Sequence, residues 1–165
     1  MTREEQHATP EELAADQFVA TLVQERASIV GLASQSIRHG DSRYVAAGPT
    51  EIHRRIESLY DQMTGAISAR DLRDILGYAE DLARERFESG YDLAELQAAF
   101  NALEEATWST LCARLEPQSL GMSLGLVSTV LGAAKDALSR EYASLASRSH
   151  VRSLDLSALF TGSGA

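Results

Sequence analysis

ARERFESGYDLAELQAAF, residues 83–100, holds the end of one predicted helix and the start of the next. Before Gly90, apolar side chains recur at spacings of three and four, which is typical of an amphipathic helix. Gly90 itself is a common kind of helix stop. Asp92 and Glu95 then stand three residues apart, which is the spacing of a capping box at a helix start. The stretch therefore predicts two helices joined by a short turn.

The same signals recur on both sides of this stretch. Prolines stand where helices are expected to start, and Ser68 with Asp71 resembles a second capping box. The predicted helices run from Pro10 to about His39 before Gly40, Pro49 to Ile67, Ser68 to Gly90, Asp92 to Glu116, and Pro117 to about Ser147. Strand-like alternation bounded by turn residues is not found in the sequence. We therefore expect an all-α fold of about five helices, packed as a bundle or in a globin-like way.

The length of the chain, 165 residues, is that of one domain. We expect a flexible N-terminus over residues 1–9 and a single helical domain over residues 10–150. Residues 151–165 keep a few apolar side chains and then become rich in glycine and serine, which predicts a C-terminal tail or linker.

The charge of the chain limits its partners. It carries 15 Lys and Arg against 24 Asp and Glu, a net charge of −9. Nucleic acid and anionic membranes both bind basic faces, so neither is an expected partner. The polar segment from Met1 to Pro10 lacks the apolar core of a signal peptide, and no apolar run approaches the roughly 20 residues of a membrane span. We therefore expect a cytoplasmic protein.

The residues that carry most enzyme and metal chemistry are scattered. The histidines His7, His39, His53 and His150 form no helical pair, and sequence motifs for phosphate, dinucleotide or nucleophilic-serine sites are missing. We therefore expect no enzyme activity, no catalytic residues, no metal site and no cofactor. A haem sensor remains an alternative, because one axial histidine suffices and His53 lies within a predicted helix.

One predicted helix carries a cysteine near an aromatic residue. Trp108 and Cys112 are one turn apart, and Asn101 lies near them on the same helix. A reactive thiol needs a basic neighbour, whereas Arg114 at i+2 points to another side of the helix. The simplest interpretation of Cys112 is therefore a small buried hydrophobic residue.

The last predicted helix carries a strip of small residues. Gly121, Gly125, Ser128 and Gly132 recur at spacings of four, three and four. Each glycine costs a helix about 0.8–1 kcal/mol relative to alanine, so the strip needs a reason. The simplest reason is close approach of a neighbouring helix, and the alternative is room for a ligand between helices. The candidate ligand- or partner-binding residues are Asn101, Trp108, Cys112, Gly121, Gly125 and Gly132.

The first predicted helix is apolar or small over a wide arc. Beside its main apolar face stand Leu13, Ala20, Val23, Ala27 and Val30. A helix with so wide an apolar arc needs cover on two sides, and its own bundle covers one. We therefore expect a homodimer.

Residues 83–100 resemble the N-terminal sensory domains of the RsbT co-antagonist, or RsbRD-type, family. The resemblance extends over roughly residues 50–147, and a long last helix ending near Tyr142 also fits it. The residues that carry it are Arg86, Gly90, Leu93, Glu95, Leu96, Ala99 and Phe100.

The resemblance implies an all-helical, often dimeric domain that passes signals to an attached output domain and has no catalytic residues. The chain departs from that pattern, because its 165 residues leave no room for an output domain, so we expect either an excised sensory domain or a stand-alone protein. We expect a non-catalytic signal-input domain in stress-response signal transduction, which binds a regulatory protein or a small molecule. The alternatives are a dimerisation scaffold without a ligand and the globin-like haem sensor.

Overall fold

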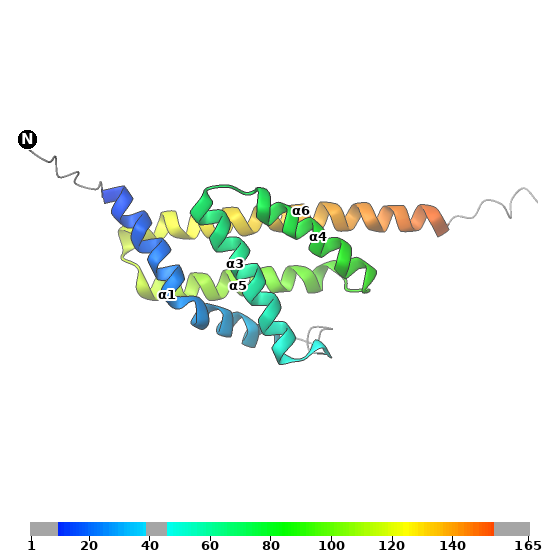
Figure 1. Ribbon diagram of the computed structural model, residues 1–165, viewed down its shortest axis with the longest axis horizontal. Coiled ribbons are helices and arrows are strands. Elements are labelled where there is room, and N and C mark those ends of the chain that lie inside the picture. The colour runs from blue at the N-terminus through cyan, green and yellow to red at the C-terminus, as the bar shows by residue number, and fades with distance from the viewer. Residues whose placement is uncertain (1–9, 39–45, 154–165) are drawn as a thin grey trace, which may run out of the picture.

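The computed structural model describes residues 10–38 and 46–153, and helices make up nearly all of them (Figure 1). The helices are α1 (Pro10–Arg38), α3 (Pro49–Ala69), α4 (Arg73–Glu88), α5 (Leu93–Arg114) and α6 (Pro117–Ser153). No residue of the described ranges is in a strand, and none of their helices is long and apolar enough to cross a membrane. The predicted all-α fold of about five helices is confirmed.

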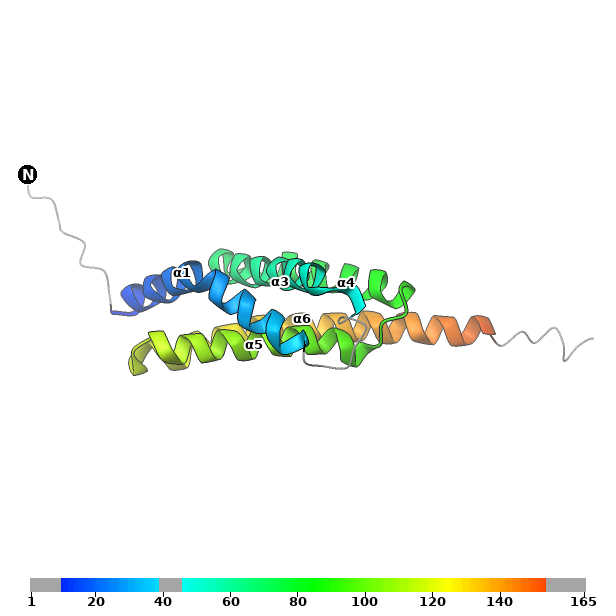
Figure 2. The same ribbon diagram turned by 90° about the horizontal axis from the view of Figure 1, so that it is seen from below.

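The helices form a bundle of two layers. α3 and α4 lie in one layer and α5 and α6 in the other, while α1 crosses between them (Figure 2). The most extensive packing joins α4 to α6 and α1 to both α5 and α3. The C-terminal part of α6 extends beyond the other helices (Figure 1). No described helix covers the side of the α5–α6 layer that faces away from α3 and α4 (Figure 2).

The core contains the apolar faces that the spacing of the sequence predicts. Each helix contributes side chains that are almost wholly buried, among them Phe18, Leu22, Ile52, Ile56, Met63, Ile75, Leu96, Phe100, Leu103, Val127, Leu131 and Leu138. Tyr60 of α3 also lies in the core, and its hydroxyl donates a hydrogen bond to the carbonyl oxygen of Leu22 at 2.5 Å. Burial raises the pKa of Tyr60 to about 12, because the interior disfavours the phenolate.

The turn between α4 and α5 agrees with the prediction. The Asp92 carboxylate accepts a hydrogen bond from the backbone N–H of Glu95 at 2.7 Å, and the Glu95 carboxylate accepts one from the N–H of Asp92 at 3.0 Å. Gly90 adopts a φ of 75°, a left-handed conformation that strains most other residues. The predicted stop and the capping box at the start of α5 are therefore both confirmed.

The turn between α3 and α4 does not agree with the prediction. Ser68 lies inside α3, so the predicted capping box of Ser68 and Asp71 is wrong. Arg70 ends α3 in a left-handed conformation, and its N–H bonds the last carbonyl groups of that helix. The carboxylate of Asp71 instead accepts a hydrogen bond from the N–H of Arg73 at 3.0 Å, where α4 begins.

The end of the last helix differs from the prediction, and other predicted ends cannot be compared. α6 continues to Ser153, beyond the predicted end near Ser147 and into the predicted tail. The predicted stop at His39 and Gly40, the predicted flexible N-terminus and residues 154–165 all lie outside the described residues.

Candidate functional site

The structure brings the sequence-predicted binding residues together on one surface. We define the outer face as the solvent side of α5 and α6, formed by Asn101, Glu104, Glu105, Trp108, Ser109, Cys112, Gly121, Gly125, Ser128 and Gly132. The residues of α5 in this set line an open groove. The glycine strip of α6 lies beside this groove, because Ser128 Oγ donates a hydrogen bond to Glu104 Oε1 across the two helices at 2.8 Å.

Three polar residues of the outer face, Asn101, Glu104 and Ser128, are already paired. Lys135 Nζ donates to Glu104 Oε2 at 3.0 Å and to Asn101 Oδ1 at 3.2 Å. These contacts join α5 to α6 and satisfy the side-chain oxygens that a ligand would otherwise bind. What remains open on this face is therefore mostly aromatic or small.

Within residues 10–38 and 46–153, no helix fills the glycine strip. A Cβ atom placed on Gly121, Gly125 or Gly132 would have no neighbouring atom within 4 Å. The expected close approach of a neighbouring helix is therefore wrong for the part of the chain that the structure describes. The strip faces open space beside the groove of α5.

Cys112 is exposed, so its interpretation as a buried hydrophobic residue is wrong. The reason lies in the orientation of α5, which turns Leu103, Thr107 and Leu111 into the core with no exposed surface. Trp108 and Cys112 lie on another side of the same helix, and Trp108 is 41% exposed. An exposed tryptophan beside an open groove indicates a surface for binding.

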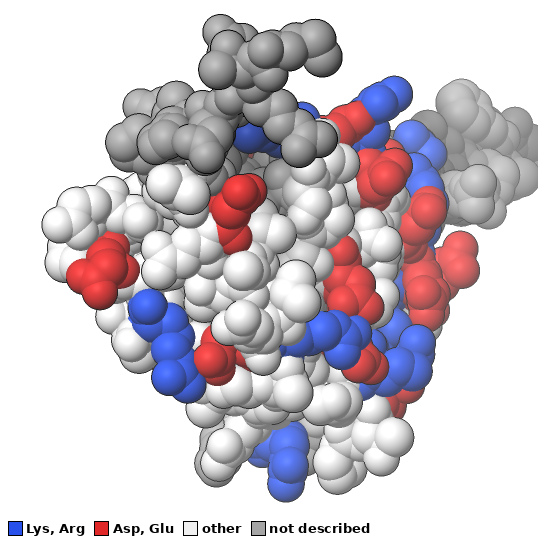
Figure 3. Space-filling view, turned by 60° about the vertical axis from the view of Figure 1, so that its left-hand side comes forward, with Lys and Arg blue, Asp and Glu red and all other residues white. Residues whose placement is uncertain are grey.

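The first helix leaves a second apolar surface open. Leu13 is 58% and Val23 is 70% exposed, and Ala20 and Ala27 are exposed with them. We call these four residues the α1 stripe. Val30, which was expected to belong to it, lies in the core. On the face shown in Figure 3, acidic and basic side chains are interspersed around uncharged surface and are not gathered by sign.

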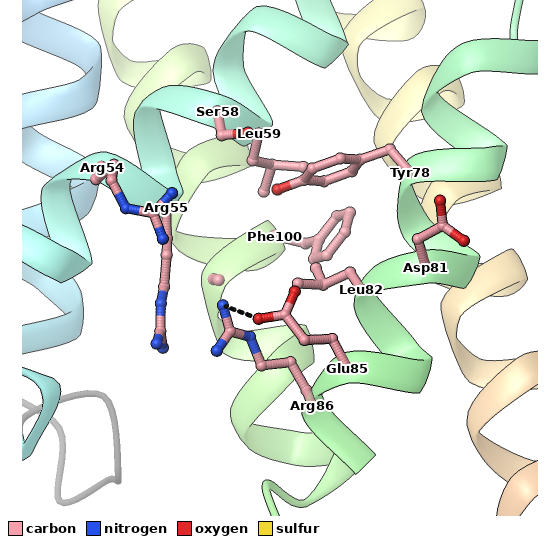
Figure 4. Close-up of a pocket in the computed structure, with 11 residues that line it drawn as sticks. Arg54, Arg55, Ser58, Leu59, Tyr78, Asp81, Leu82, Glu85, Arg86 and Phe100 are labelled. Carbon is pink, nitrogen blue, oxygen red and sulfur yellow. Dashed lines mark ion pairs between the residues drawn. The ribbon is translucent and has the colours of Figure 1, made fainter. Parts of the chain in front are cut away.

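A cavity that the sequence did not indicate lies between α3, α4 and α5. Its volume is about 200 Å³. We call it the arginine cavity; it is lined by Arg54, Arg55, Ser58, Leu59, Tyr78, Asp81, Leu82, Glu85, Arg86, Ala99 and Phe100 (Figure 4). Its wall is thus partly apolar and partly made of basic and hydroxyl groups.

Arg86 is the most unusual residue of this cavity. It is only 7% exposed, and its Nε is buried without a hydrogen-bond partner. Its guanidinium lies 5.5 Å from the centre of the Tyr91 ring, and one terminal nitrogen is 3.4 Å from Glu85 Oε1. Figure 4 shows the guanidinium extending from α4 into the space between the helices. A buried donor without an acceptor is costly, so this residue needs an explanation.

The other two arginines are held at the cavity by one carboxylate. Arg54 donates to Glu51 at 2.7 and 2.8 Å, and Arg55 donates to it at 2.7 Å. These bonds, with that of Arg54 the largest cause, lower the pKa of Glu51 to about 2. Arg55 also donates to the hydroxyl oxygen of Tyr91 at 3.1 Å. Burial raises the pKa of Tyr78, so its hydroxyl stays protonated and can donate.

His53, the histidine considered for haem, is exposed on α3 and does not line this cavity. Among the residues that the structure describes, no three His, Cys, Asp or Glu side chains are grouped so that they could hold a metal ion.

These observations define the class as an all-helical domain, with one open face on α5 and α6 and one cavity lined partly by arginines. The family model of the RsbT co-antagonist protein rsbRD N-terminal domain matches residues 11–158. The chain belongs to this family, which is one of regulatory domains and not a known enzyme family. No curated protein matches the chain.

Proposed function

We propose that this chain is a signal-input domain that acts by noncovalent binding and pairs with a second copy of itself through the outer face. The observation that carries the proposal is the family match over residues 11–158. The description of the family as an RsbT co-antagonist supports a regulatory protein as the further partner, in stress-response signal transduction.

The shapes on the outer face favour a second copy of this chain as the occupant. Trp108 provides a large side chain, and Gly121 and Gly125 provide a strip without side chains beside it. In a two-fold dimer each copy presents the same surface, so a protrusion of one copy can fill a hollow of the other. Small residues also allow helices to approach closely, because side-chain size sets the distance between their axes.

The projecting end of α6 is suited to carry the signal onward. Close to that end, the Tyr142 hydroxyl donates to the carbonyl oxygen of Tyr91 at 3.0 Å, and its ring meets Phe87 edge-on at 5.2 Å. Glu141 accepts a hydrogen bond from Arg84 at 2.9 Å. A change in packing at the α4–α5 turn would therefore reach the projecting part of α6 directly.

Analytical ultracentrifugation tests the proposed pairing. We expect a dimer of the 17.9 kDa chain at micromolar concentrations, and a monomer when Trp108→Glu places a charge on the outer face. The matched control is Val23→Glu, which places the same charge on the α1 stripe and is expected to leave the dimer intact. A monomer in the parent chain would contradict the proposal, and a dimer lost only in Val23→Glu would move the interface to the α1 stripe.

A further inference from the structure

The interior of the arginine cavity is positive although the whole chain is acidic. Its two carboxylates lie at the solvent side, since the side chains of Asp81 and Glu85 are 79% and 65% exposed. Asp81 is already paired with Arg84 at 2.6 Å. Arg86, by contrast, is nine-tenths buried with an unpartnered Nε. The inner end of the cavity therefore presents a guanidinium whose Nε lacks an acceptor, while one terminal nitrogen lies 3.4 Å from Glu85 Oε1.

We propose that this cavity binds a small organic carboxylate, with Arg86 as the group that receives it. A guanidinium and a carboxylate match as two parallel hydrogen bonds, and an oxygen at that position would satisfy the Nε of Arg86. Leu59, Leu82 and Phe100 provide an apolar wall for the body of the ligand. A volume of about 200 Å³ lies below the roughly 300 Å³ at which drug-sized pockets begin, so the ligand is small.

Arg86 also contacts Tyr91, the residue of the α4–α5 turn that is hydrogen-bonded to α6. The guanidinium groups of Arg55 and Arg86 both lie 5.5 Å from the centre of the Tyr91 ring. The carbonyl oxygen of Tyr91 in turn accepts the hydrogen bond of Tyr142 on α6. A carboxylate that draws Arg86 toward it would change the contact between Arg86 and Tyr91. Tyr91 is the residue whose carbonyl oxygen holds Tyr142 of α6. The role of the ligand as a signal rests on the proposed function, whereas its binding does not.

Isothermal titration of the full chain with benzoate and with benzamide tests the inference. The two probes have the same shape and differ in charge, so we expect benzoate to bind saturably at millimolar concentrations and benzamide at least about tenfold more weakly. Arg86→Met should weaken benzoate at least about tenfold, which corresponds to one charge-assisted pair. The matched control is Arg140→Met on the exposed side of α6, which should bind benzoate like the parent.

A second variant covers the case in which Arg86→Met does not fold. Ser58 is half-buried at the cavity, so Ser58→Phe has room to place a ring in it and should abolish benzoate binding while Arg86 is kept. The inference is overturned by equal binding of benzoate and benzamide, by unchanged binding in folded Arg86→Met, by tighter binding of inorganic phosphate than of benzoate, or by no benzoate binding to the parent. The proposed dimer is tested by sedimentation and the carboxylate site by titration. Failure of one proposal can therefore be distinguished from failure of the other.

Discussion

The outer face and the arginine cavity both take residues from α5 but differ in how they are built. Phe100 of α5 lines the cavity and has no exposed surface, whereas Trp108, eight positions later, is 41% exposed on the outer face. The outer face consists of one side of two neighbouring helices. The cavity takes residues from three helices and encloses charge. An open surface of small residues suits a protein partner, and a concave site lined by arginines suits a small anion.

The largest expected effect is a difference in the free energy of unfolding between alanine variants of Phe100 and Trp108. Phe100→Ala removes a ring from the core and should lower the free energy of unfolding by about 3–5 kcal/mol. Trp108→Ala removes a partly exposed ring and should change the stability of the monomer by less than about 1 kcal/mol. Urea denaturation at low protein concentration measures both. Equal losses in the free energy of unfolding would show that Trp108 is packed as firmly as Phe100. The outer face would then not differ from the core in the way described.

The second prediction concerns the stability effect of the buried charge. Arg86→Met keeps the length of the side chain and removes a buried group whose Nε has no acceptor. Replacing poorly paired buried charges by apolar residues of similar size is often neutral or stabilising, so we expect a gain of roughly 1–2 kcal/mol in the absence of ligand. Arg140→Met is the exposed control and should stay within about 0.5 kcal/mol of the parent. A clear loss of stability in Arg86→Met would mean that Arg86 serves the fold.

The sequence predicted the outer face better than the cavity, and the reason is physical. Trp108 and Cys112 on α5, and the glycine strip on α6, stand at helical spacings, so each helix places its own set on one side. Their exposure depends on which side of the helix faces the core, and that was misjudged for Cys112. The capping box at Asp92 was predictable because its partners are three residues apart.

The cavity depends on contacts between helices that no local pattern reveals. Arg86, Ala99 and Phe100 are among the residues that carry the family resemblance, but no sequence pattern indicates that they line a cavity. All three line the cavity together with Arg54 and Arg55 of α3. The spacing of α4 places Arg86 on the side of buried Ala79 and Ala83, but an arginine on that side of a helix can still extend its charged end to solvent. Burial of that one arginine is decided by the packing of α3 and α5 against α4.

The third prediction concerns the acid pH dependence at the mouth of the cavity. Hydrogen bonds from Arg54 and Arg55 lower the pKa of Glu51 to about 2, against about 4.3 in an unfolded chain. A lowered pKa stabilises the fold above about pH 4.3, and the contribution disappears as the pH falls towards 2. Glu51→Gln should therefore cost about 1 kcal/mol at pH 7, a discounted value because the side chain is 31% exposed.

Urea unfolding at a series of pH values measures this difference. The curves of the parent and Glu51→Gln should converge as the pH approaches 2, since the parent loses the same contribution. Glu105→Gln on the exposed outer face is the control and should stay within about 0.5 kcal/mol of the parent at pH 7. A constant gap between the parent and Glu51→Gln at every pH would show that the arginines do not hold this carboxylate.

The smallest expected effect is a gain in the stability of the isolated chain together with a weaker dimer, and it tests the outer face most directly. Gly125→Ala and Gly132→Ala each add a methyl group that meets no atom within 4 Å, so the isolated chain should gain about 0.5–1 kcal/mol from the better helix propensity of alanine. In the proposed dimer the same methyl group enters the space that the second copy occupies, so the dimer should dissociate at lower concentrations. Gly65→Ala on α3 is the matched control, because it is also exposed with no atom within 4 Å but lies away from the outer face. It should raise the melting temperature without changing the sedimentation. If Gly125→Ala, Gly132→Ala and Gly65→Ala all stabilise the chain and all leave the dimer unchanged, the glycine strip faces only water and the outer face is not where two copies meet.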